Sequence, residues 1–167
     1  MWPIKQALQN ITAKEKLFWV LNSFGKINYY DQKRVRMIKI EYESKTIAII
    51  IPANFEKDGI HFFTPNEYSQ QLAYMKRPSG YIITPHTHRP VSREVFNTLE
   101  TLFIRKGKVK MNFFNEKREF IQEYVVSTGD VILLVSGGHG FEMLEESEII
   151  EVKQGPFMGD QDKVRFY

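Results

Sequence analysis

The chain contains no cysteine among its 167 residues. This absence excludes disulfide bonds, thiolate metal sites, iron–sulfur clusters and cysteine nucleophiles from the chain. Long apolar runs are missing as well: the run Ile47–Ile51 ends at Pro52, far short of the roughly 20 residues that cross a bilayer as a helix. The first residues also lack the zones of a secretory signal. We therefore expect a cytoplasmic protein without a membrane span.

A strong excess of one charge sign is also lacking, because the formal net charge is only +3. The densest basic stretch, residues 33–36, is too short to make the many phosphate contacts of a nucleic-acid-binding face. The hydrophobic share of 43% and the charged share of 26% are ordinary for a folded globular chain. We expect no nucleic-acid partner.

The N-terminal third changes its hydrophobic period once. Residues 1–24 carry apolar side chains at helical intervals, which predicts a helix. Residues 36–42 then alternate with a period of two, and residues 46–51 follow after a short polar turn, which together predict a β-hairpin. Residues 53–66 contain turn residues and are predicted to be a connecting loop. We therefore expect residues 1–66 to form a helix and hairpin extension packed on a second part, residues 67–167.

This second part is predicted to be entirely β-structure. Short alternating segments are separated by turn signals such as Gly107 and Gly129. The expected strands are residues 68–76, 80–85, 97–106, 109–115, 118–126, 130–135, 139–145 and 147–154. Eight short strands with regular turns favour an antiparallel barrel or jelly roll. The predicted fold class is all-β.

Two of the four histidines lie two residues apart, as His86 and His88. On a strand this spacing puts both imidazoles on one face. Two neutral imidazoles form half of a divalent transition-metal site, which a carboxylate and another nitrogen from neighbouring strands would complete. His61 lies outside this pattern, and we expect it to be a packed or surface residue.

Two segments further along carry a more specific pattern. Gly80 precedes the His-x-His pair by five intervening residues, and Glu100 precedes Gly107 by six. A second segment begins with Gly129 and an aspartate, continues through a hydrophobic run and a glycine pair, and ends at His139. These segments resemble the two motifs of the cupin superfamily. The resemblance covers roughly residues 68–154, and it departs from the family pattern in the eleven residues that separate the second histidine from Glu100 and in a second motif one residue short.

The resemblance implies a double-stranded β-helix, the jelly-roll barrel of cupins, with one divalent transition metal inside it. The metal would be iron, manganese, nickel, cobalt or zinc, for which three imidazoles and a carboxylate are suitable ligands. Glu94 is a rival carboxylate because it lies nearer to the His-x-His pair, but it belongs to an expected loop, whereas Glu100 begins an expected strand. The implied metal ligands are His86, His88, Glu100 and His139.

Other polar residues near these motifs have weaker assignments. Glu142 follows His139 by three residues, so on a strand we expect it on the opposite face. Lys153 and Gln154 end the last expected strand and could reach a pocket mouth, although simple surface positions are the more frequent case for such residues.

The resemblance therefore implies a metal-binding cupin that acts on or binds a small polar molecule, with dioxygenase-, isomerase- or decarboxylase-like chemistry left open. One alternative is a metal-free sugar-nucleotide epimerase or isomerase, in which a histidine acts as general base. Another is a non-catalytic module that binds or senses a small ligand. We also expect a homodimer, because the hairpin predicted near the N-terminus leaves an exposed strand edge.

Overall fold

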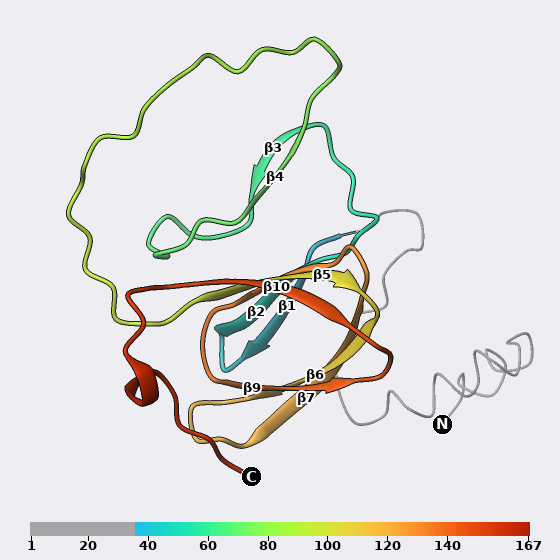
Figure 1. The fold of residues 1–167 in the computed structure, drawn as a ribbon, viewed down its shortest axis with the longest axis vertical. Helices are drawn as coiled ribbons and strands as arrows, with labels where there is room; N and C mark the ends of the chain where they lie inside the picture. The colour runs from blue at the N-terminus through green and yellow to red at the C-terminus, as the bar shows by residue number, and fades with distance from the viewer. Residues whose placement is uncertain (1–35) are drawn as a thin grey trace, which may run out of the picture. The chain divides into compact units, whose positions relative to one another are not determined.

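The computed structural model describes residues 36–167 of the chain (Figure 1). The described residues belong to one compact unit, Val35–Tyr167. The helix expected over residues 1–24 lies outside them. From residue 36 onwards the regular structure is antiparallel β-sheet with one short 3-10 helix, so the expected all-β class is confirmed for this part. No helix in the same residues has the length and apolarity needed to cross a membrane.

Within residues 36–167, ten strands form three sheets. A five-stranded sheet has the order β1-β2-β8-β5-β10, a three-stranded sheet has the order β7-β6-β9, and β3 pairs with β4 alone. The elements in chain order are β1 (Ile38–Tyr42), β2 (Lys45–Ile51), β3 (Gly59–Phe62), β4 (Ala73–Lys76), β5 (Glu100–Lys106), β6 (Lys108–Phe114), β7 (Phe120–Ser127), β8 (Val131–Leu134), β9 (Gly138–Met143), β10 (Glu148–Lys153) and the 3-10 helix η2 (Gly159–Asp162).

The predicted hairpin is confirmed as β1 and β2. Glu43 and Ser44 form its turn with positive φ angles of 47° and 66°, values that suit a tight two-residue connection. β2 also pairs with β8, so the hairpin supplies two strands to the five-stranded sheet. The expected boundary between an extension and a barrel at residue 66 stays a prediction.

Two local expectations differ from the structure. The predicted strand at residues 80–85 has no strand partner, and it lies in a segment, residues 77–99, that contains no strand. Its apolar side chains face solvent, with Ile82 82% exposed, so no buried face selects the pleated conformation. The predicted loop at residues 53–66 contains β3, which pairs with the shortened strand β4.

The five-stranded and three-stranded sheets share one hydrophobic core. Alternate residues of β6 are buried, and the same alternation in β5 buries Leu102 and Ile104, as expected for strands that pack on one face. Phe113 on β6 is 0% exposed. The core residues are Ile40, Ile47, Ala48, Ile50, Leu102, Ile104, Val109, Met111, Phe113, Val126, Ile132 and Leu134.

The outer face of the five-stranded sheet is covered in its centre. Ile49 of β2 and Leu133 of β8 are fully buried there, and they pack with Leu99 against side chains from residues 63–72. This second layer explains why β2 and β8 are continuous apolar runs, because both faces of these strands are buried.

Truncation of the core is expected to be costly. Phe113→Ala should lower the free energy of unfolding by about 3–5 kcal/mol, because it removes a buried ring and leaves a cavity. Phe120→Ala is the matched control, since Phe120 is 58% exposed, and it should cost far less. Urea denaturation followed by fluorescence measures both changes, and equal losses would contradict this description of the core.

Candidate functional site

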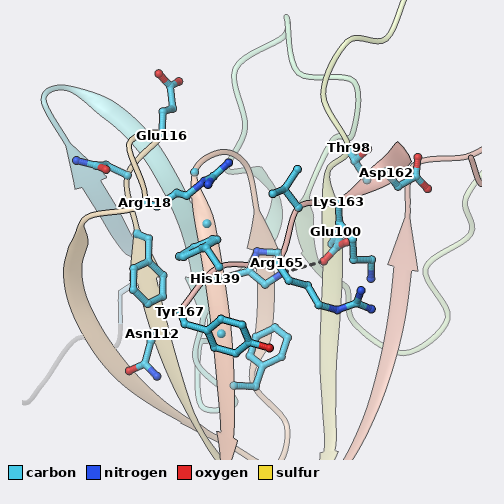
Figure 2. Close-up of a pocket in the computed structure, with 18 of the residues that line it drawn as sticks. Thr98, Glu100, Asn112, Glu116, Arg118, His139, Asp162, Lys163, Arg165 and Tyr167 are labelled. Atoms are coloured by element: carbon cyan, nitrogen blue, oxygen red, sulfur yellow. Dashed lines mark ion pairs between the residues drawn. The ribbon is translucent and has the colours of Figure 1, made fainter. Parts of the chain in front are cut away.

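A cavity of about 820 Å³ opens beside the core, and it involves the edge strands β9 and β10. Its size is in the range of small-molecule sites. Figure 2 shows its wall, with polar and charged side chains on several elements. The lining residues are Thr98, Glu100, Asn112, Phe114, Asn115, Glu116, Arg118, Gly137, Gly138, His139, Gly140, Phe141, Glu151, Lys153, Asp162, Lys163, Val164, Arg165, Phe166 and Tyr167.

Glu100 is the first residue of β5 and faces the interior of the sandwich. It shares one side of the strand with Leu102 and Ile104, which are buried in the core. Its own side chain is 15% exposed. Glu100 therefore occupies the first inward-facing position of β5, and the next two inward-facing positions are apolar.

His139 lies on β9 and also faces inward. It pairs with the buried Phe113 across the β6–β9 ladder, and directly paired residues of antiparallel strands share a face. The preceding Gly137 has a φ of 69°, and a Cβ there would overlap with the carbonyl oxygen of Phe114. Only glycine fits at this position of the turn, which explains the first glycine of the pair before the histidine.

The side chains of Glu100 and His139 meet across the two sheets. Glu100 Oε2 lies 3.3 Å from His139 Nε2 (Figure 2), so residues 39 positions apart in sequence form one contact at the cavity. The interaction with His139, the largest effect, lowers the pKa of Glu100 below its usual value of 4.5. Burial opposes this shift, while Lys153 and Lys163 add to it. Glu100 is therefore a carboxylate at neutral pH.

Two cations near Glu100 come from the C-terminal part. Lys153 pairs with Glu100 in the β5–β10 ladder, and its Nζ lies 3.8 Å from Asp162 Oδ2. Lys153 thus lines the cavity, although a simple surface position is the more frequent case for such a residue. Lys163 follows η2 in extended conformation and interacts electrostatically with Glu100.

The other two implied ligands lie elsewhere. His86 and His88 have ring centroids 5.3 Å apart, but both belong to the exposed segment of residues 75–98 and neither lines the cavity. Across residues 36–167, no group of three or more histidine or acidic side chains is placed to hold a metal ion. The structure thus brings together Glu100 and His139 and leaves the His-x-His pair apart from them.

The remaining candidates can be placed directly. Glu94 lies in the same exposed segment and does not line the cavity. His61 Nε2 hydrogen-bonds the carbonyl oxygen of Asp58 at 2.7 Å, which agrees with a role outside the site. Glu142 faces away from His139, as expected, and forms an ion pair with Lys110.

Three cations of the cavity wall had no role in the sequence interpretation: Arg118, Lys163 and Arg165. Arg118 belongs to the turn between β6 and β7, and the other two belong to the tail after η2. The tail carries no hydrophobic period or motif that would predict a functional role. The alternation of Lys163 and Arg165 in an extended segment was the only available hint.

Comparisons with known proteins identify no relative: no protein-family model, no curated protein and no solved structure matches the chain. The cupin resemblance therefore depends on the motif spacing alone.

The Glu100–His139 contact predicts a specific pH dependence of stability. Because the pKa of Glu100 is lowered in the folded state, its contribution is present above its usual pKa and is lost as the pH falls through the folded value. Glu100→Gln should therefore flatten the decline of unfolding free energy on acidification below about pH 5. Urea denaturation of EDTA-treated protein at a series of pH values measures this decline.

Glu151→Gln is the matched control, because Glu151 lines the same cavity and has no ion pair within residues 36–167. Glu151→Gln should keep the wild-type dependence of unfolding free energy on pH. An unchanged profile in Glu100→Gln would mean that the contact contributes nothing to folding.

Proposed function

We propose that this chain binds a small polar molecule in the cavity beside β9 and β10, with the Glu100–His139 pair at the centre of the site. The observation that carries the proposal is the 3.3 Å contact between these two side chains at the cavity wall. Glu100 continues the series of the buried Leu102 and Ile104 on β5, and His139 lies opposite the buried Phe113 in the β6–β9 ladder. The side chain of His139 is 32% exposed and lines the cavity, so the contact is accessible to a ligand, and interacting polar groups of this kind cluster at functional sites.

The donor chemistry also supports a divalent transition metal at this site. Imidazole and carboxylate are the ligands that iron, manganese, nickel, cobalt and zinc share. As placed, the residues fit half of the proposed set: Glu100 and His139 would hold the metal from two sheets, and His86 and His88 would complete it. When bound, the metal would supply a Lewis acid or redox centre.

Chain connectivity is compatible with this four-ligand set. Eleven residues separate His88 from Glu100, and an extended chain of that length reaches roughly 40 Å. The intervening residues form no strand, and those from 89 to 98 are exposed, so rearrangement of this segment would break no sheet pairing. The reaction, whether dioxygenase-, isomerase- or decarboxylase-like, stays open.

A metal-free role is the second candidate, and the same contact favours it. If Nε2 of His139 carries the proton and donates it to the Glu100 carboxylate, the imidazole is held in one tautomer and Nδ1 keeps a free lone pair. Such an imidazole can act as a general base on a proton next to a carbonyl, as in a sugar-nucleotide epimerase or isomerase. Metal content separates the two candidates.

Elemental analysis of protein purified without an affinity tag tests the metal proposal. We expect about one equivalent of a divalent transition metal per chain, and we expect Glu100→Gln and His139→Ala to lose it. His61→Ala is the matched control and should retain the metal, because His61 bonds the Asp58 carbonyl oxygen and lies outside the cavity.

The His-x-His pair is tested separately. His86→Ala and His88→Ala should also lose the metal if the four-ligand set is correct, whereas full retention would remove both residues from the site. Protein that neither copurifies with nor rebinds a metal would overturn the metal proposal and leave the metal-free role.

We also propose a homodimer formed through β1. This strand is an edge of the five-stranded sheet, and no strand of the described part pairs with its outer side. An open edge offers unpaired backbone groups to a second copy. Size-exclusion chromatography with light scattering should give twice the chain mass of 19.7 kDa, and Ile38→Pro should shift the protein toward monomer. A single-chain mass for the wild type would contradict the dimer.

A further inference from the structure

The cavity wall holds equal numbers of cationic and anionic side chains, but their pairing is unequal. The cations are Arg118, Lys153, Lys163 and Arg165, and the carboxylates are Glu100, Glu116, Glu151 and Asp162. Equal numbers alone would give no preference for the charge of a ligand. The preference depends on which of these groups already have partners.

Most of the carboxylates already contact a basic side chain. Glu100 contacts His139, Asp162 pairs with Lys153 at 3.8 Å, and Glu116 Oε1 lies 3.0 Å from the Nζ of Lys45 outside the wall. Only Glu151 has no ion pair with any residue in the range 36–167.

Most of the cations form no ion pair with a described carboxylate. Among the side chains that the structure describes, Asp160 excepted, Arg118, Lys163 and Arg165 have no carboxylate at ion-pair distance. Three cations without an ion-pair partner therefore share one concave site with two carboxylates, Glu100 and Glu151, that pair with no lysine or arginine of the described residues. Concave walls of one sign focus the electrostatic potential on the space that they enclose.

The tail that supplies two of these cations is anchored to the sheets. The Phe166 ring packs edge-on against Phe114 with centroids 5.1 Å apart, and the Arg118 guanidinium lies 5.8 Å from the centre of the same ring. At the other end of the tail, Asp162 Oδ2 lies 3.8 Å from the Nζ of Lys153 on β10. Lys163 and Arg165 lie between these two anchors.

The wall therefore offers two kinds of contact. Glu100 and His139 provide a hydrogen-bond acceptor and an imidazole on the strands, while the turn and the tail provide the uncompensated cations (Figure 2). A ligand that satisfies both needs an anionic group and a hydroxyl or amine group. Guanidinium and ammonium groups bind carboxylate and phosphate through charge-assisted hydrogen bonds.

We infer that the ligand of this cavity is a small organic anion, carrying a carboxylate or phosphate group that Arg118, Lys163 and Arg165 bind. This inference rests on the proposed function, the binding of a small polar molecule in the same cavity, and it adds the charge of that molecule. The C-terminal tail is then part of the binding site and determines its specificity.

Inorganic phosphate is the probe that tests this inference. The full chain is first dialysed against EDTA, so that phosphate cannot bind through a metal, and binding is then measured by isothermal titration calorimetry. We expect saturable binding in the millimolar range that weakens as sodium chloride is raised. The double variant Lys163→Gln with Arg165→Gln should bind about tenfold more weakly, and Arg118→Gln should also weaken binding.

Two control variants isolate local charge from fold and from net charge. Lys163→Arg with Arg165→Lys keeps both charges and should retain wild-type affinity. Lys57→Gln with Arg105→Gln removes the same total charge at exposed positions outside the cavity, and it should also bind like the wild type. Absence of saturable phosphate binding, or equal loss in both neutralised double variants, would overturn the inference.

Failure of this inference is distinguishable from failure of the proposed function. A chain that holds metal through Glu100 and His139 but does not bind phosphate would keep the metal site and lose the anion preference. A metal-free chain that binds phosphate through Lys163 and Arg165 would keep the anion preference and lose the metal site.

Discussion

The packing of two sheets through one set of alternating apolar residues is the constraint on which the rest of the structure depends. Strands from both sheets each turn every second residue toward the shared core, and the most buried of them, such as Phe113 and Ile132, are fully enclosed. This packing fixes which face of each strand is the inner face. The interpretation of Glu100 follows from that assignment, because Glu100 continues the buried series of Leu102 and Ile104. The interpretation of His139 follows from its position opposite the buried Phe113 on the edge strand β9.

The candidate site begins where the apolar series ends. On β5 the inner series passes from Ile104 and Leu102 to Glu100, and on β10 it passes from Ile149 to Glu151 and Lys153. The two sheets therefore continue to face each other while their side chains change from apolar to charged. A polar cavity attached to a rigid apolar core is a favourable arrangement for a binding site, because the strands hold the polar groups in place.

The sequence predicted much of this arrangement for clear reasons. Strands β5 to β10 were predicted because their alternation and turn glycines were strong, and Glu100 was preferred over Glu94 because it continued the series of Leu102 and Ile104. The predicted strand at residues 80–85 was wrong because alternation alone does not supply a partner strand. The tail cations were missed because residues in an irregular segment acquire their position only from tertiary contacts, here the packing of Phe166 on Phe114.

The exposed connection between β4 and β5 can change in length at little cost to the fold. Its ends are held by the β3–β4 pairing at Lys76 and by the buried Leu99, and the side chains between them contribute nothing to the core. The entropy of closing a flexible connection rises only by about 0.6 kcal/mol for each doubling of its length. Insertions and deletions in this connection are therefore nearly neutral for folding, and its exposed residues can diversify independently of the sandwich.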